Sequence, residues 1–180
     1  MALSAKPEMV TTRVSFSRLL AGETQEIAEL LAESSEFHKG WVSYPTAPDQ
    51  VSSFVAAADT NGMMIFGVRL KADDALAGIM TLCRFAGEPW NTAEYGCAVG
   101  VRYRGHGYLT EATSMLVRYA FGELGLHRIE ALVQPENYSS TRMLKTAGFR
   151  VEGTARGAIR VHGAWVDHVR WAILAEDVAN

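Results

Sequence analysis

The sequence contains little cysteine, no excess of basic residues and no long apolar run. Its only cysteines, Cys83 and Cys97, show neither a disulfide framework nor the spacing of metal ligands. We interpret both as reduced core thiols and expect no bound metal. No apolar run reaches the about 18 residues that cross a membrane, and the first residues do not resemble a secretory signal. These absences predict a cytoplasmic protein with no membrane partner.

The charge balance predicts a small anionic ligand. With 17 Lys and Arg against 20 Asp and Glu, the formal net charge is −3, so no broad basic face is available for nucleic acid. The basic residues gather locally, around residues 102–104 and 150–170. The chain has 180 residues, 48% of them hydrophobic, which suits one core. We therefore expect a flexible arm over residues 1–9 and a single domain over residues 10–177.

Residues 98–112 combine a strand end, a basic glycine turn and the start of an amphipathic helix. Gly105 and Gly107 permit positive φ and a close approach of ligand to backbone. The amides of residues 104–108 would point outward at a helix N-terminus, which favours an anion. Arg102 and Arg104 add full positive charges beside them. The stretch therefore predicts a phosphate-binding turn.

Hydrophobic periodicity predicts an α/β (α+β) chain. Strands are expected over residues 10–20, 63–70, 75–85, 93–101, 127–134, 151–161 and 165–174, and helices over residues 23–37, 46–58, 107–124 and 137–146. The strands on either side of the helix at 107–124 should be parallel and complete a β-α-β unit. His162 and Gly163 form a credible two-residue turn between the last two strands.

The glycine turn is neither a Walker loop nor a complete dinucleotide fingerprint, because no Gly-Lys-Ser/Thr follows and the third position holds Thr110. It matches Arg/Gln-x-x-Gly-x-Gly/Ala over Arg102 to Gly107. A second segment runs from Asn137 through Ser140 to Gly148-Phe149. With Ala93-Glu-Tyr-Gly and the later Gly-Tyr-x-Thr-Glu-Ala, the chain resembles the GNAT superfamily of N-acetyltransferases, in its RimJ/RimL-like branch.

This resemblance implies a mixed central sheet of about six to seven strands, splayed at an acetyl-CoA site, with about four helices. It also implies acetyl transfer from acetyl-CoA to a primary amine by direct attack in a ternary complex, with a protein or peptide N-terminal α-amine as the expected acceptor. The cofactor contacts that it implies come from the glycine turn, from two main-chain positions of the preceding strand and from the later helix: Val99, Val101, Arg102, Arg104, Gly105, His106, Gly107, Tyr108, Asn137 and Ser140.

The catalytic groups depart from the family pattern. The usual tyrosine that protonates the leaving thiolate is replaced by Leu144, and the RimL-like pattern puts Ser140 near the sulfur instead. The glutamate of the penultimate strand is replaced by Ile159. Glu94 is the first substitute as general base, acting through water, followed by Asp167 and His168. Capping of the helix by Asn137 and ion pairing of Glu94 or Asp167 are the structural alternatives.

The acceptor pocket is less defined by the sequence. Trp41, Tyr44, Phe85 and Trp90, together with Asp167, are candidates to line it, although the aromatics would serve equally as core residues. A small amine, such as an antibiotic or an amino-acid conjugate, is the alternative acceptor. A catalytically idle acyl-CoA-binding module is the alternative from another class, kept open by Leu144 and Ile159. The chain is expected to be a monomer or a homodimer.

Overall fold

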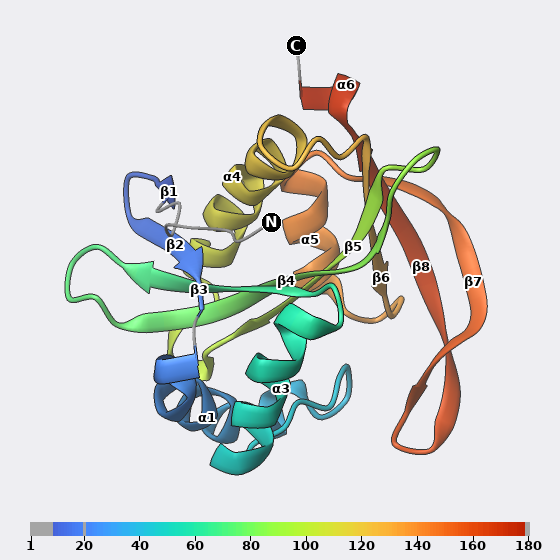
Figure 1. The fold of residues 1–180 in the computed structure, drawn as a ribbon. Helices are drawn as coiled ribbons and strands as arrows, with labels where there is room; N and C mark the ends of the chain where they lie inside the picture. The colour runs from blue at the N-terminus through green and yellow to red at the C-terminus, as the bar shows by residue number, and fades with distance from the viewer. Residues whose placement is uncertain (1–8, 20, 179–180) are drawn as a thin grey trace.

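Eight strands form one mixed sheet in the computed structural model, which describes residues 9–19 and 21–178 (Figure 1). Along the sheet the order is β1-β2-β3-β4-β5-β6-β8-β7, and only β5 and β6 pair in parallel. The strands are β1 (Met9–Val10), β2 (Val14–Arg18), β3 (Met64–Leu70), β4 (Leu76–Ala86), β5 (Thr92–Val99), β6 (Arg128–Val133), β7 (Arg150–Val161) and β8 (Ala164–Leu174).

The eighth strand comes from a turn in the segment expected to be one strand. Thr11 turns the chain so that β1 pairs antiparallel with β2, and its backbone N–H donates to the carbonyl of Val14 at 2.8 Å. Met9, expected in the arm, therefore belongs to the sheet. Residues 1–8 of that arm lie outside the described residues. The expected mixed sheet is confirmed, with β1 added at its edge.

The helices follow the expected order. They are α1 (Thr24–Glu33), α2 (Ser35–His38), α3 (Pro48–Thr60), α4 (Tyr108–Gly122), α5 (Tyr138–Thr146) and the short α6 (Ala175–Val178), with 3₁₀ turns η1 (Ala21–Glu23) and η2 (Val101–Tyr103). Pro48 starts α3, where its missing N–H costs no hydrogen bond. The region expected as one helix at 23–37 is α1 and α2, which meet at Ser34.

Two hydrophobic clusters hold helices on opposite faces of the sheet (Figure 1). Side chains alternate along β3, so that Ile65 packs with α1 and α3 while Phe66 packs with α4. Leu116 of α4 and Leu144 of α5 are almost fully buried on the second face. The helices α1 and α3 cover the first half of the sheet, and β6, β8 and β7 extend beyond them (Figure 1).

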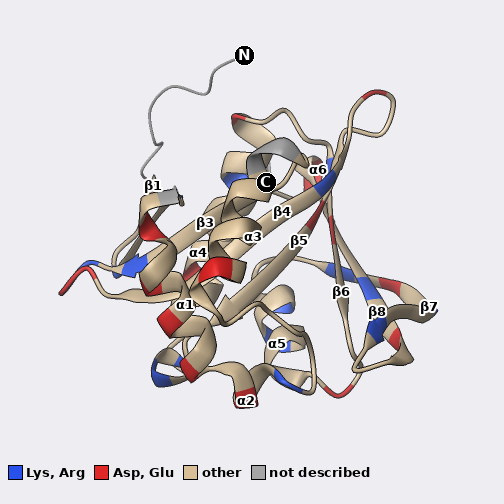
Figure 2. Ribbon diagram, turned by 60° about the horizontal axis from the view of Figure 1, so that its bottom comes forward, with Lys and Arg blue, Asp and Glu red and all other residues tan. Residues whose placement is uncertain are grey.

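Charges of both signs occur along this outer half of the sheet, whereas acidic residues mark α1 (Figure 2). Arg128 on β6 pairs with Glu130 at 2.8 Å and also with Glu152 of β7. The two residues between β7 and β8, His162 and Gly163, both have positive φ, at 46° and 86°, as a tight hairpin turn requires. Among the described residues, no helix has the length and apolar character needed to cross a membrane.

Candidate cofactor and acceptor site

Strands β5 and β6 separate after three paired residues. Their parallel pairing runs from Thr92 opposite Arg128 to Glu94 opposite Glu130 and stops there, although both strands continue. The separation opens a cavity of about 350 Å³. Its lining includes Trp41, Tyr44, Glu94, Cys97, Gln134, Asn137, Ser140, Ile159, Arg160, His162 and His168. The splay of the sheet expected from the sequence is therefore present.

The edge of β5 that faces this gap offers backbone carbonyls. Gly100 donates its N–H to the Ala77 carbonyl at 2.8 Å, on the β4 side. Alternate residues of an antiparallel strand direct their backbone groups to opposite edges, so the carbonyls of Cys97 and Val99 face away from β4. An extended ligand lying in the gap would find acceptors at this edge.

The end of α2 and the loop that follows it contact these two carbonyls. The Tyr44 hydroxyl donates to the Cys97 carbonyl at 3.2 Å, and Nε2 of His38 lies 2.9 Å from the Val99 carbonyl. Burial raises the pKa of Tyr44 far above its ordinary value of 10, with smaller increases from Cys97 and Cys83. Burial lowers the pKa of His38, and the Val99 contact offsets part of that change. Tyr44 is therefore a protonated donor.

The same loop is attached to the other half of the sheet. Gln134, at the end of β6, donates its side-chain amide to the carbonyls of Gly40 and Trp41 at 3.1 and 3.2 Å. His162, in the β7–β8 turn, hydrogen-bonds the Lys39 carbonyl. Because both halves of the splayed sheet hold the loop, it forms a fixed wall of the cavity.

The glycine turn lies between η2 and α4. Gly105 and Gly107 have φ of 79° and 78°, and α4 begins at Tyr108. The first amides of a helix have no partner within it, so this turn presents donors to a ligand. A Cβ added at Gly105 would meet no atom within 4 Å. The Val101 amide, by contrast, donates to the Ser34 hydroxyl at 2.9 Å.

Side chains of the turn are held by neighbours in α1 and α2. Arg102 forms an ion pair with Glu33 at 2.5 Å but remains 70% exposed. The Arg104 guanidinium lies over the Phe37 ring at 5.6 Å. Beyond them, the His106 ring stacks on Tyr108 with centroids 5.5 Å apart. The exposed guanidinium of Arg102 leaves positive charge available beside the amides.

Helix α5 places two of the expected residues at the cavity. Asn137 caps the helix, accepting from the Ser140 amide at 3.1 Å through Oδ1, as the structural alternative required. Both residues also line the cavity, and Ser140 is half-buried. Leu144, one turn further along, is 1% exposed and belongs to the core.

This geometry agrees with comparisons to known proteins. The model of the family described as "Acetyltransferase (GNAT) domain" matches residues 13–150. The chain belongs to this family of GNAT acetyltransferase domains. It is 43% identical over 112 residues to the probable N-acetyltransferase YjcK of Bacillus subtilis, a match that covers 62% of each protein. The chain thus spans less than two thirds of the length of this relative.

Longer matches have lower identity. The [ribosomal protein uS5]-alanine N-acetyltransferase of Escherichia coli is 24% identical, over 96% of this chain and 93% of that protein. The structure of Mycobacterium smegmatis RimJ in complex with CoA-disulfide has a TM-score of 0.86 at 26% identity, covering 93% and 84%. A Vibrio cholerae spermidine N-acetyltransferase with CoA and spermine has a TM-score of 0.81 at 20% identity, covering 94% and 100%, and shows the shared fold.

In this GNAT domain only some of the candidate bases reach the cavity. Glu94 lines it and forms an ion pair with Arg84 at 3.2 Å, which is one structural alternative expected from the sequence. His168 also lines it and is 3% exposed. Asp167 does not line the cavity, because its Oδ1 accepts the Gly157 amide at 2.7 Å in the bulged part of β7.

The tautomer of His168 is constrained by the backbone. Its Nδ1 lies 3.0 Å from the Val166 carbonyl, which can only accept, so Nδ1 carries the proton. In the neutral ring Nε2 is then the acceptor nitrogen, with no hydrogen-bond partner among the described residues. The sequence ranked His168 after Glu94 as a candidate base. Its burial could not be predicted, because which alternate residues of β8 are buried depends on the tertiary structure.

The acceptor aromatics divide into two groups. Trp41 and Tyr44 line the cavity, as expected. Phe85 and Trp90 do not: Phe85 lies near the end of β4 and Trp90 on the β4–β5 connection, and they are 38% and 66% exposed. This connection carries the chain past the end of the paired strands, so its side chains face solvent instead of the gap. The sequence could not distinguish these positions because all four aromatics flank strands or turns.

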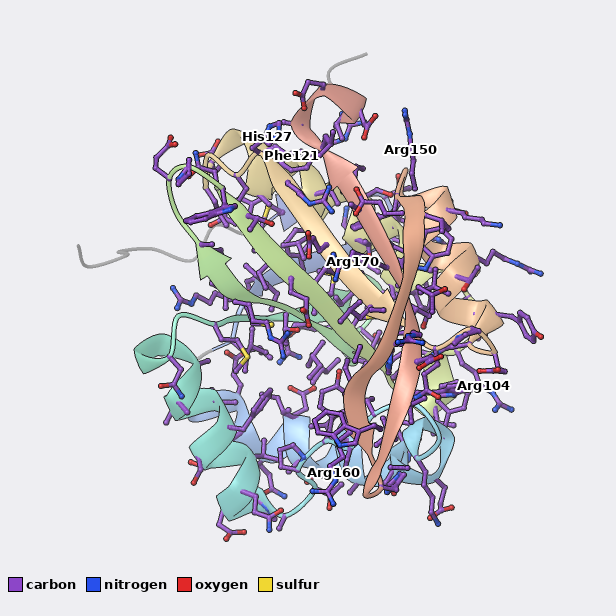
Figure 3. The ribbon with its side chains drawn as sticks, turned by 90° about the vertical axis from the view of Figure 1, so that its right-hand side faces the viewer. Arg104, Phe121, His127, Arg150, Arg160 and Arg170 are labelled. Atoms are coloured by element: carbon purple, nitrogen blue, oxygen red, sulfur yellow. The ribbon has the colours of Figure 1, made fainter. Side chains whose placement is uncertain are left out.

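The ionisable residues of the cavity include one carboxylate. Glu94 is accompanied by Arg160, His162 and His168. Arg160 lies near the tip of the β7–β8 hairpin, and Arg170 lies further along the hairpin (Figure 3). Among the residues that line the cavity, Glu94 is therefore the carboxylate that an acceptor amine meets.

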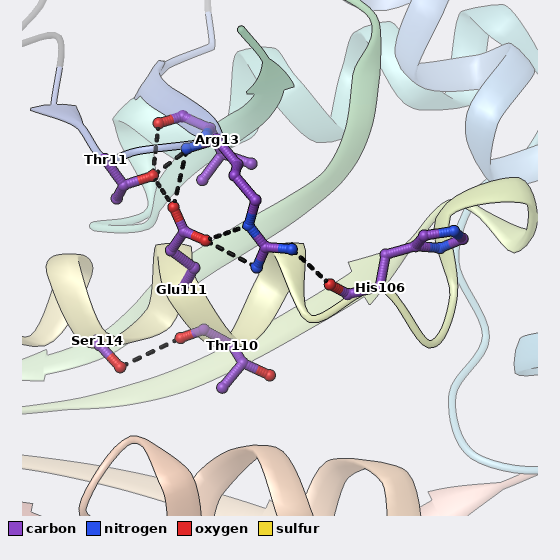
Figure 4. Close-up of polar contacts among 7 residues, drawn as sticks. Thr11, Arg13, His106, Thr110, Glu111 and Ser114 are labelled. Carbon is purple, nitrogen blue, oxygen red and sulfur yellow. Dashed lines mark hydrogen bonds and ion pairs between the residues drawn. The ribbon is translucent and has the colours of Figure 1, made fainter. Parts of the chain in front are cut away.

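Sequence reasoning missed the residues beneath the glycine turn. Arg13 pairs with Glu111 in the first turn of α4 and also contacts the His106 carbonyl (Figure 4). Thr11 donates its hydroxyl to the same carboxylate. Glu111 was visible as part of the Gly-Tyr-x-Thr-Glu-Ala motif, but no spacing connects it to a strand almost a hundred residues earlier.

Proposed function

We propose that this chain transfers the acetyl group of acetyl-CoA to a primary amine, with a protein or peptide N-terminal α-amine as the acceptor class. The observation that carries the proposal is the separation of β5 from β6 after Glu94, beside a glycine turn at the start of α4. A pantetheine-like chain needs such a gap, and a diphosphate needs such a turn. The cytoplasmic location stays a prediction.

The residues present fit the cofactor. The amides of Arg104 to Tyr108, with Arg102, would hold the pyrophosphate, because Gly105 leaves open space on its side of the turn. The backbone of Val99 would contact the pantetheine, and the free side-chain NH₂ of Asn137 would donate to it. Val101 needs its amide released from Ser34 to take part in the same way. When bound, acetyl-CoA supplies the activated thioester.

The chain would contribute four groups to the reaction. The loop from Trp41 to Tyr44 orients the acceptor in the cavity, which gives proximity. A backbone amide of β5 near Val99 stabilises the oxyanion. The Ser140 hydroxyl donates a proton to the departing sulfur, and Glu94 accepts the amine proton through water. His168 is the alternative base, since its Nε2 is free to accept.

Charge in the cavity favours an α-amine over a polyamine. A polyamine carries several positive charges, and their desolvation requires several carboxylates. The cavity offers Glu94 alone, with Arg160 nearby. An N-terminal α-amine has a pKa of about 7.7–8.0, so about a tenth or more is neutral at pH 7 and modest base assistance suffices. The match to an enzyme named for alanine of ribosomal protein uS5 supports the same acceptor class.

Two alternatives remain. A small amine, such as an antibiotic or an amino-acid conjugate, would also fit a cavity of about 350 Å³. An idle acyl-CoA-binding module is the other, because Leu144 is buried and Ile159 occupies the place of a carboxylate. The idle module does not explain why Ser140 and His168 share the cavity with the unpaired edge of β5, whereas the small-amine alternative differs from the proposal only in its acceptor.

A thiol-release assay with acetyl-CoA tests the proposal. The panel contains peptides with different first residues, free amino acids, spermidine and amine antibiotics, with N-acetylated peptides as matched controls. We expect release with free N-termini and none with the blocked peptides. Thiol release with the small amines alone would show that the acceptor is a small amine and not a peptide N-terminus. Tight binding of acetyl-CoA without release for any amine would favour the idle module.

A further inference from the structure

Arg13 joins the β1–β2 turn to the glycine turn through two hydrogen bonds and an ion pair of its side chain. Nε donates to Oε2 of Glu111 at 2.8 Å, and Nη2 lies 2.8 Å from the same oxygen. Nη1 donates to the His106 carbonyl at 3.0 Å (Figure 4). The guanidinium also lies 5.1 Å from the centre of the Tyr108 ring. One side chain therefore contacts both ends of the turn and the first turn of α4.

The partner carboxylate is fixed as well. Oε1 of Glu111 accepts the Arg13 backbone amide at 3.1 Å and the Thr11 hydroxyl. Thr11 is itself held in its turn, since its hydroxyl accepts from the Val14 amide at 3.1 Å. These contacts occupy both carboxylate oxygens, so Glu111 holds Arg13 in one orientation toward His106.

The contact with His106 determines the direction of the next amide. In a trans peptide the C=O and the following N–H point in opposite directions. Holding the His106 carbonyl toward Arg13 therefore turns the Gly107 N–H away from β2. Gly107, with φ of 78°, has no rigid conformation of its own, so a neighbour is needed to hold this peptide.

The pair also removes an electrostatic conflict. Glu111 lies in the first turn of α4, where an unpaired carboxylate would repel a diphosphate bound at the helix N-terminus. Arg13 neutralises that charge while remaining 49% exposed. A cationic partner in the β1–β2 turn thus makes the Glu111 carboxylate compatible with an anionic ligand at the same end of α4.

We propose that Arg13 is a positioning residue for the cofactor: anchored by Glu111, it holds the His106–Gly107 peptide so that the Gly107 amide faces the pyrophosphate. This inference rests on the proposed use of acetyl-CoA. It predicts an effect confined to ligands that carry the diphosphate. The reaction rate with acetylated pantetheine, which lacks the diphosphate, should not depend on Arg13.

The test measures the affinity for CoA by calorimetry in wild type, Arg13→Met and Arg13→Lys. We expect the dissociation constant for CoA to rise about tenfold in Arg13→Met, because hydrogen bonds to a charged group are lost. Arg13→Lys should recover only part of this loss, since one ammonium cannot replace a planar fork that reaches Glu111 and His106 together. The matched control is Arg150→Met, which breaks the Arg150–Asp177 pair of 2.7 Å away from the turn.

Kinetics separate positioning from general destabilisation. In Arg13→Met the KM for acetyl-CoA should rise, while the acceptor KM and the rate with acetylated pantetheine stay as in wild type. Equal CoA affinity in wild type and Arg13→Met would overturn the inference, as would an equal loss with acetylated pantetheine. Wild-type protein that binds CoA but acetylates nothing would refute the proposed transfer alone, because the affinity comparison would still apply.

Discussion

The hydroxyl of Tyr44 donates to the carbonyl of Cys97 at 3.2 Å and joins the loop after α2 to the part of β5 that does not pair with β6. With His38 and Gln134, it makes this loop a wall of the cavity instead of a mobile cover. Acceptor and cofactor would therefore meet between a fixed loop and a splayed strand. The consequences of this arrangement can be measured one group at a time.

Removing the Tyr44 hydroxyl should loosen that wall. For Tyr44→Phe we expect the free energy of unfolding to fall by about 1 kcal/mol, the net value of one hydrogen bond, and the acceptor KM to rise. Urea unfolding and steady-state kinetics measure the two effects. The control is Tyr138→Phe, because Tyr138 is 75% exposed. Equal unfolding midpoints for the two variants would show that the Cys97 contact contributes nothing.

A large side chain in the glycine turn should abolish cofactor binding without destabilising the fold more than the same substitution at another glycine of positive φ. Gly105 and Gly125 have φ of 79° and 66°, and neither has an atom within 4 Å of an added Cβ. Gly105→Trp and Gly125→Trp should therefore lose similar stability, about 1–2 kcal/mol, from left-handed strain. Calorimetry with CoA should detect binding in Gly125→Trp and none in Gly105→Trp. Binding by both would place the diphosphate elsewhere.

Ser140→Ala should separate binding from chemistry. The Asn137 cap uses the Ser140 amide and not its hydroxyl, so α5 is retained. We expect an unchanged CoA affinity and a kcat lowered by about a hundredfold, the lower end of the range for a positioned proton donor. The neighbouring Ser139→Ala, at an exposed site of the same helix, is the control. An unchanged kcat would remove Ser140 from the mechanism.

The base can be identified through the pH at which its loss matters. Glu94→Gln should reduce kcat/KM at pH 7 by about tenfold or more. The deficit should shrink above about pH 8.5, where the α-amine of the acceptor loses its proton unaided. Asp167→Asn, whose carboxylate bonds Gly157, should not change the rate. If His168→Gln shows this behaviour and Glu94→Gln does not, His168 is the base.

Glu111 should contribute to stability only above acidic pH. Burial raises its pKa, but the bonds from Thr11 and Arg13 outweigh that effect and hold the pKa below its ordinary value of 4.5. A depressed pKa stabilises the fold above the unfolded-state pKa, and this stabilisation is lost as pH falls through the folded-state pKa. Urea unfolding should show wild type more stable than Glu111→Gln at pH 7, with the difference shrinking below about pH 4. A constant difference would contradict the ionic role.

The sequence predicted the elements well where local signals are strong. Gly105, Gly107 and the apolar stripe of α4 determine a strand, a turn and a helix within a few residues. The His162–Gly163 hairpin was predicted for the same reason. Short-range patterns could not reveal the reversal at Thr11 that makes β1 a separate strand, because residues 10–18 alternate almost continuously.

By itself, the sequence determined the order of the elements, the glycine turn and the family, since each depends on periodicity or on motifs contiguous along the chain. Only the tertiary structure decided which side chains share the cavity: Trp41 and Tyr44 enter it, and Phe85 and Trp90 do not. It also brought Arg13 to Glu111 across 98 positions of sequence. The reason is physical: spacing determines the face of an element, whereas contacts between elements depend on how the whole sheet packs and splays.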